Sequence, residues 1–124
     1  MKRKINYRGK RVDNNQWVEG YFFKHLDKCY IAWATINDKP MMTEVVPETV
    51  GQFTGMTDYF DVDIYEGDIL QSEYGLCIVV FDDISWAAKS PGSEAIDYEN
   101  RMFFENCSVV GNIHDDTELI EDET

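Results

Sequence analysis

The residues of this sequence that could do chemistry are mainly carboxylates. They occur in three close pairs: Asp61 and Asp63, Asp82 and Asp83, and Asp115 and Asp116. Paired carboxylates can hold a divalent cation, or act as acid and base because one raises the proton affinity of the other. In a chain with 24 acidic residues such pairs also arise by chance and at turns. We therefore expect no metal site, and keep a carboxylate- or metal-dependent hydrolase only as the lesser alternative.

Other catalytic or cofactor-binding patterns are missing from the sequence. His25 and Cys29 have a spacing that suits a metal on a helix, but their neighbours are typical of a strand and a turn. There is no phosphate-binding Gly-Lys-Ser/Thr loop and no GxGxxG motif, and no nucleophile–histidine arrangement emerges from residue order. We expect a protein that is not an enzyme and needs no cofactor.

The charge of the chain is strongly negative and uneven. The 124 residues carry a formal charge of −13, yet six of the eleven basic residues lie in the first twelve positions. From Ser93 onward there are ten acidic residues and one basic residue, Arg101. Such a surface repels a phosphate backbone, which makes nucleic acid an unlikely partner unless the basic N-terminal edge forms one patch. The same charge leaves open an acidic nucleic-acid mimic that sequesters a nucleic-acid-binding protein.

Cysteine usage and hydropathy indicate the compartment. The three cysteines have no CxxC spacing, and two of them lie in apolar strand patterns, which is typical of buried, reduced thiols. The longest apolar run, Leu76 to Phe81, is too short to cross a bilayer, and the charged N-terminus is not followed by a signal-peptide core. We expect a soluble, cytoplasmic protein with no membrane partner.

The elements that must position these residues are short strands separated by turns. A hairpin is predicted at residues 37–40, and residues 76–82 form the most apolar strand and should lie at the centre of a sheet. Trp17 and Trp33 lie in strand patterns and are expected in the core. We interpret residues 51–62 as an ordered loop and residues 95–104 as a short helix or an irregular segment. Asp115 and Glu118 have the spacing of a capping box.

The segment Glu66-Gly67-Asp68-Ile69 favours a small barrel. Glycine permits the sharp bend that closure of a small barrel requires, and the aspartate can accept the freed backbone amides. We therefore predict a mainly β fold with little helix, whose interior is filled by aromatic side chains. Residues 1–50 would form an N-terminal β portion, and residues 51–124 an SH3-like or pseudo-barrel portion, together one compact unit.

Several short motifs occur together in a fixed order. They are Gly51-Gln-Phe-Thr54-Gly55, then Tyr65-Glu66-Gly67-Asp68, and finally Gly111-Asn112. In this combination the chain resembles the YopX-like family of small phage and prophage proteins over essentially its whole length. The resemblance implies an all-β fold and a phage or prophage origin, with the protein located in the cytoplasm of a bacterial host, and it brings no assigned activity. The chain departs from the family pattern at residues 59–63, which contain no glycine.

Together these observations predict an accessory protein that works by binding. Exposed strand edges in a small β fold favour pairing between copies, so the partner is expected to be a host or phage protein, the protein itself as a homo-oligomer, or both. The predicted contact surface is Asp82, Asp83 and Trp86, because an aromatic side chain beside acids suits protein recognition.

Overall fold

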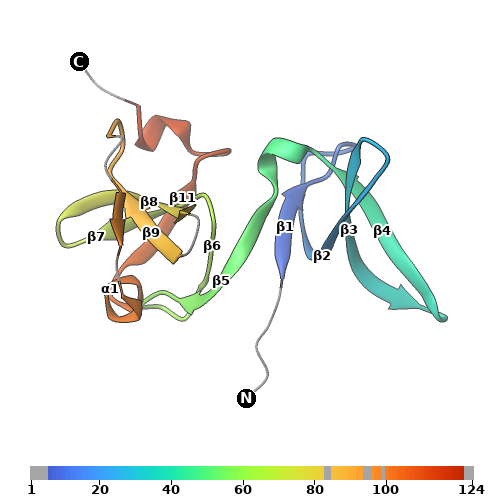
Figure 1. Ribbon diagram of the computed structural model, residues 1–124, viewed down its shortest axis with the longest axis horizontal. Helices are drawn as coiled ribbons and strands as arrows, with labels where there is room; N and C mark the ends of the chain where they lie inside the picture. The colour runs from blue at the N-terminus through green and yellow to red at the C-terminus, as the bar shows by residue number, and fades with distance from the viewer. Residues whose placement is uncertain (1–5, 83–84, 94–95, 99, 122–124) are drawn as a thin grey trace. The chain divides into compact units, whose positions relative to one another are not determined.

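Antiparallel strands account for most of the computed structural model, which describes residues 6–82, 85–93, 96–98 and 100–121 (Figure 1). One sheet has the strand order β4-β3-β2-β1-β5-β6 and the other β10-β9-β8-β7-β11. The mainly β fold class predicted from the sequence is confirmed. Neither sheet closes into a barrel within the described residues, so the SH3-like form stays a prediction.

The chain divides into two compact units, residues 1–53 and 54–124. The first unit contains β1 (Tyr7–Lys10), β2 (Trp17–His25), β3 (Lys28–Ile36), β4 (Lys39–Val45), the 3-10 turn η1 (Pro47–Thr49) and the start of β5 (Gly51–Thr57). The second unit contains the rest of β5, β6 (Asp63–Tyr65), β7 (Asp68–Ser72), β8 (Gly75–Asp82), β9 (Ser85–Lys89), β10 (Ile96–Tyr98), α1 (Arg101–Glu105), β11 (Ser108–Asn112) and η2 (Thr117–Leu119).

Turn chemistry explains the strand pairing of the first unit. Asn37 and Asp38 both have positive φ, 52° and 64°, which is the backbone of the tight hairpin turn predicted between β3 and β4. Gly20 in β2 is required by a close approach, because a Cβ atom there would lie 2.1 Å from the carbonyl oxygen of Ala32 in β3. The β2–β3 pair therefore depends on glycine at this position.

The core of the first unit is small. Its buried side chains are Cys29, Ile31 and Val45, and four partly buried residues pack against them: Tyr7, Val18, Phe22 and Val50. The buried residues of β3 alternate with exposed or half-buried ones, as expected for a sheet with one face on a core.

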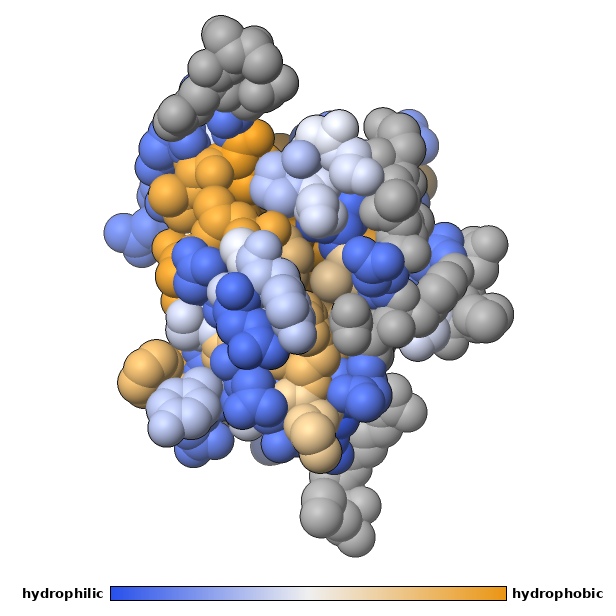
Figure 2. Space-filling view, turned by 90° about the vertical axis from the view of Figure 1, so that its left-hand side faces the viewer, coloured by the Kyte–Doolittle hydropathy of each residue, from blue (hydrophilic) through white to orange (hydrophobic). Residues whose placement is uncertain are grey.

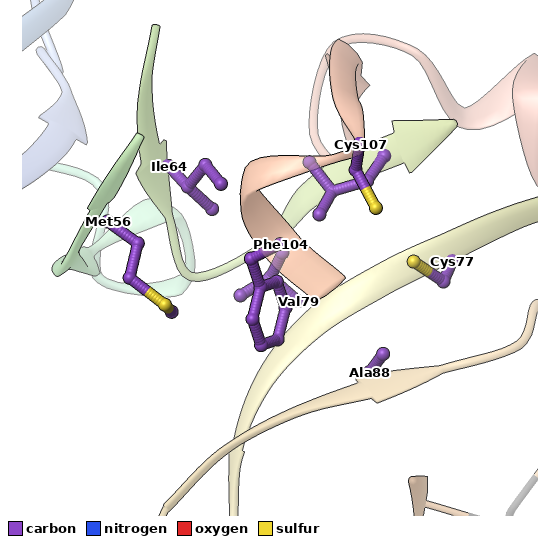
Figure 3. Packing of buried hydrophobic residues seen from close by; sticks show 8 residues of the cluster. Met56, Ile64, Cys77, Val79, Ala88, Phe104 and Cys107 are labelled. Atoms are coloured by element: carbon purple, nitrogen blue, oxygen red, sulfur yellow. The ribbon is translucent and has the colours of Figure 1, made fainter. Parts of the chain in front are cut away.

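The second unit has the larger core. Phe104 of α1 is fully buried and points into a cluster formed by β5, β6, β7, β8 and β9, where its ring lies beside Val79 (Figure 3). The other buried members of the cluster are Met56, Ile64, Leu70, Cys77, Ala88 and Cys107. β8 lies between β7 and β9 at the middle of the five-stranded sheet, as its apolar sequence predicted.

Three sequence interpretations are corrected by the structure. Residues 51–57 form strand β5 rather than a loop, since Gly51 and Gln52 pair with Arg8 and Tyr7 of β1. The predicted capping box is absent: η2 has Asp116, not Asp115, at its N-cap position and shows no side-chain capping bond. The core is also mainly aliphatic and sulfur-containing, because among the described aromatic residues only Phe53, Tyr65 and Phe104 are buried.

The two tryptophans that the sequence predicts in the core are not buried. Trp33, which was expected in the core, is 41% exposed, and Trp17 is half-buried. Residues 95–104, interpreted as helix or irregular structure, contain β10 and the start of α1, while residues 95 and 99 lie outside the described part. The three cysteines are buried, and none forms a disulfide.

Candidate binding site

Strand alternation places a row of aromatic side chains on the outside of the first unit. In β2, Val18 and Phe22 pack against the core, so Trp17, Tyr21 and Phe23 project from the opposite face. The register continues this face onto the neighbouring strands, because Lys10 pairs with Trp17 on one side and Tyr30 pairs with Phe23 on the other. We call the set Arg8, Lys10, Trp17, Tyr21, Phe23 and Tyr30 the aromatic face.

Two cations are held against the tryptophan of this face. The guanidinium carbon of Arg8 lies 4.7 Å from the centroid of the Trp17 ring, and the ammonium nitrogen of Lys10 lies 5.6 Å from it. Both are within the range of a cation–π interaction. The contacts fix two long and otherwise mobile side chains, which reduces the entropy that binding would cost.

The middle of the face is apolar and open. Phe23 and Tyr30 stack with their ring centroids 5.3 Å apart and an interplanar angle of 15°, while Tyr21 beside them is 69% exposed. Tyr21 pairs with Ala32, which in turn pairs with the 46% exposed Met42 of β4. Tyrosine, tryptophan, arginine and methionine are the residues enriched at protein–protein interfaces.

The acids on this face are already engaged. Glu19 pairs with Arg8 in the β1–β2 register and accepts a hydrogen bond from the side-chain amide of Asn6 at 3.4 Å. Glu44 lies 3.8 Å from the ammonium group of Lys28. The face therefore presents mainly aromatic rings and cations, while Glu19 and Glu44 have partners within the unit.

The outer edge of β4 is less available than the sequence suggested. The amide of Val12 donates to the carbonyl of Glu44 at 3.0 Å, and the amide of Val46 donates to the carbonyl of Lys10 at 2.8 Å. Pro40, nearer the start of the strand, has no amide hydrogen to offer. Both features are recognised ways of protecting a sheet edge, so this strand offers few backbone groups for pairing with another strand.

The motif residues of the second unit hold backbone in place. Asp68 is 1% exposed and its carboxylate accepts the amide of Tyr65 at 2.8 Å across Gly67, which has φ +90°. This is the structural role that the sequence predicted for the aspartate. Thr54 donates from its hydroxyl to the carbonyl of Ile64 at 2.8 Å.

The remaining motif residues are also placed by local structure. The carbonyl of Gly55 accepts a bond from the guanidinium of Arg101 at 2.9 Å. The side-chain oxygen of Asn112 accepts the amides of His114 and Asp115, both at 2.9 Å, and Gly111 leaves room for the carboxylate of Asp116. Gly51 is a buried residue of β5, and Glu66 is half-buried at the β6–β7 turn.

Asp58 is an important residue that the sequence analysis missed. It is 5% exposed, and its carboxylate accepts three backbone amides, those of Phe60 at 2.8 Å, Val62 at 2.9 Å and Val109 at 2.8 Å. Asp58 thereby fixes the 58–62 turn and attaches it to β11. The first two bonds have the local pattern of an Asx turn, which could have been recognised, whereas the third joins residues 51 positions apart.

The predicted contact surface is only partly present in the described residues. Trp86 is half-buried and packs against the core, with its ring edge-on to Phe81 at a centroid distance of 4.9 Å. Phe81 is the more exposed of the two rings, at 48%. Asp82 is half-buried and Asp83 lies outside the described residues. A contact role for these residues stays a prediction.

The carboxylate and histidine candidates do not gather into a metal site in the part of the chain that the structure describes. Within it, no three His, Cys, Asp or Glu side chains come close enough to hold an ion. His25 and Cys29 are on different faces of their hairpin, since Cys29 is in the core and His25 pairs with Lys28. Over the same residues, the structure contains no helix with the length and apolarity that crossing a bilayer demands.

One titrating pair has a resolved electrostatic effect. In the β1–β2 turn the guanidinium of Arg11 donates to both carboxylate oxygens of Asp13, at 3.0 and 2.9 Å. These hydrogen bonds lower the pKa of Asp13 and raise the pKa of Arg11. The pair orders the turn and lies on an exposed part of the unit, so it indicates no catalytic group.

The fold and the aromatic face define a small, mainly β protein with exposed aromatic side chains on one sheet. Comparison with family models then identifies the chain, because the model described as YopX protein matches residues 6–121. The chain belongs to the YopX family, as its motifs suggested. No curated protein matches it.

Proposed function

We propose that this YopX-family protein is a non-enzymatic accessory protein of a phage or prophage, which acts in the bacterial cytoplasm by binding another protein. The observation that carries the proposal is the aromatic face. A sheet that stands free in solvent normally buries its aromatic rings on one side and presents polar residues on the other. Here large rings project on the outward side as well, with Tyr21 69% exposed.

The composition of the face supports a protein as its partner. The exposed Tyr21 and Met42 are flanked by the stacked Phe23 and Tyr30, so a flat apolar centre lies beside the cations at Trp17. An apolar centre with aromatic anchors and a polar rim is the usual anatomy of a protein interface. The partner is then a phage or host protein, or a second copy of this chain.

A pair of matched variants tests this function. Tyr21→Ala with Met42→Ala removes the exposed ring at the centre of the face and the exposed Met42 side chain near it, and should abolish both capture of partner proteins from host lysate and self-association measured by light scattering. Tyr59→Ala with Val62→Ala is the control, because Tyr59 and Val62 are 69% and 47% exposed in the second unit. Equal capture and equal association by both double variants would contradict the proposal.

A second candidate function is suggested by the charge of the second unit. Residues 54–124 contain two basic and eighteen acidic residues, a formal charge of −16, whereas residues 1–53 contain nine basic and six acidic residues, a charge of +3. An acidic mimic that occupies a nucleic-acid-binding host protein would use such a unit. Proteins captured through it should be basic and should be released by added DNA, and capture that DNA leaves unchanged would exclude this function.

A further inference from the structure

The second unit contains a groove that none of the motifs accounts for. It has a volume of about 710 Å³ and lies between the β7–β8 hairpin and α1. Its lining residues include Glu73 and Tyr74 from the hairpin, Asn100, Met102 and Phe103 at the helix, and Cys107 after it. A volume of this size is typical of a site that takes a ligand or a few residues of a peptide.

The walls of the groove are exposed apolar side chains. Tyr74 is 85% exposed and Met102 is 70% exposed, while Phe103 is partly buried against the core. Such exposure is costly for two large apolar side chains on opposite sides of a hollow, and it is a feature of surfaces that are covered by a partner. Figure 2 views the molecule from the side on which Figure 1 draws the β7–β8 hairpin, and shows hydrophobic residues open to solvent among hydrophilic ones.

The groove continues into a second hollow of about 210 Å³, with which it shares Ser72, Tyr74 and Phe103. Glu73 lines the first hollow and Asp97 lines the second. No lysine or arginine is found among the described residues that line either hollow. Among these described lining residues the charged groups are therefore the carboxylates of Glu73 and Asp97.

The groove is rigidly built. The side chain of Asn100 accepts the amide of Phe103 at 3.0 Å and so caps α1, and the side-chain amide of Asn106 donates to the carbonyl of Met102 at 2.9 Å. On the opposite wall, the hydroxyl of Ser72 donates to the carbonyl of Gly75 at 2.8 Å and accepts the amide of Tyr74. Both walls are thus held by local hydrogen bonds and do not have to be ordered when a ligand binds.

We propose that this groove binds a basic peptide segment of a partner protein, with a lysine or arginine side chain placed between the Tyr74 and Phe103 rings and the Glu73 carboxylate. Charge complementarity decides the chemistry of the occupant. A unit with a formal charge of −16 attracts cations over distances of about a Debye length, and a concave site concentrates that field. Aromatic rings add a cation–π attraction, which a neutral or acidic peptide would lack.

The proposal concerns a different unit from the aromatic face and does not depend on the proposed function. It also differs from an acidic mimic, which would attract basic partners by its total charge. In the groove the effect of a carboxylate depends on its position, so two substitutions with the same change in charge should have different effects.

The test measures fluorescence polarisation of a labelled nine-residue peptide of alternating lysine and glycine on the full-length chain. Glu73→Lys should weaken binding about fivefold or more, and Tyr74→Ala about threefold. Their controls are Glu121→Lys and Tyr59→Ala, which make the same changes at exposed positions outside the groove and should leave the affinity within twofold. An acidic peptide of the same length should not bind.

Three results would overturn the proposal. The first is that the basic peptide does not bind the wild-type chain. The second is that Glu121→Lys weakens binding as much as Glu73→Lys, and the third is that the Tyr74 and Tyr59 variants have the same affinity. The second result would support attraction by diffuse charge. Circular dichroism of each variant ensures that a lost affinity is not a lost fold, and the exposed positions of these side chains make unfolding unexpected.

Discussion

The two units of this protein differ in how many of their apolar side chains they bury. The second unit buries a cluster of eight side chains around Phe104 and uses the buried carboxylates of Asp58 and Asp68 to hold backbone amides. Among the described residues of the first unit, the core cluster contains three buried side chains, Cys29, Ile31 and Val45, while large rings such as Tyr21 are exposed. The second unit buries more of its apolar side chains, while the first unit exposes large aromatic side chains on its surface.

Charge separates the units in the same way. The first carries a formal charge of +3 and the second −16, so a net charge of −13 for the chain describes neither of them. Since exposed charges are screened within about 8 Å at physiological salt, a partner meets the local charge rather than the sum. Because the two formal charges have opposite signs, the charge preference of a partner should be considered separately for each unit.

The largest loss of stability is expected from a cavity in the core of the second unit. Phe104→Ala removes a fully buried ring from the centre of the second unit, and should destabilise that unit by about 3–5 kcal/mol. Hydrogen–deuterium exchange should show faster exchange in β7, β8 and β9 than in β2 and β3. A loss below about 1 kcal/mol in urea unfolding would mean that Phe104 is not the centre of the core.

Gly20→Ala is the corresponding change in the first unit. The new Cβ would meet the backbone oxygen of Ala32 at 2.1 Å, and backbone cannot move aside as a side chain can. We expect a loss of about 2–3 kcal/mol, with faster exchange confined to β2, β3 and β4. Unchanged stability of this variant would show that the β2–β3 pair is looser than the structure has it.

Asp58→Asn tests how far the second unit depends on buried carboxylates. The substitution replaces one acceptor oxygen with an amide group, which cannot accept the bonds that the aspartate accepts from backbone. Leaving a buried amide without its acceptor costs about 1–3 kcal/mol. The measurement is the urea midpoint followed by fluorescence, and a shift within error would remove Asp58 from its structural role.

Tyr21→Ala should have the smallest effect on stability. The ring is 69% exposed and lies outside the core cluster, so the free energy of unfolding should change by less than about 0.5 kcal/mol. Calorimetry measures the free energy of unfolding of this variant, which should stay close to the wild-type value, in contrast to that of Phe104→Ala. A destabilisation above about 1 kcal/mol would mean that the aromatic face serves the fold of the first unit itself.

Local chemistry explains which parts of the fold the sequence predicted. Asn37 and Asp38 tolerate positive φ, Gly67 permits the β6–β7 turn, and the continuous apolar run of β8 indicates a central strand. Strand β5 was missed because Gly51, Gly55 and its threonines resemble a loop. Its conformation is set by pairing with β1, which is distant in sequence.

The aromatic face was harder to predict, for a reason that β2 illustrates. Both faces of this strand carry large apolar side chains, with Val18 and Phe22 on one and Trp17, Tyr21 and Phe23 on the other. Alternation alone cannot say which face is buried, so the sequence predicts Trp17 of this strand in the core. Only the positions of Ile31 and Val45 on neighbouring strands decide the question.

Site-specific photo-crosslinking is the most direct test of the proposal that the aromatic face of the first unit binds another protein. A benzophenone amino acid is incorporated at position 21 or, as the matched control, at position 59 of the second unit, and each protein is irradiated in host lysate. We predict discrete crosslinked protein bands from position 21 and none of these bands from position 59. The same bands from both positions, or bands from position 59 alone, would contradict it.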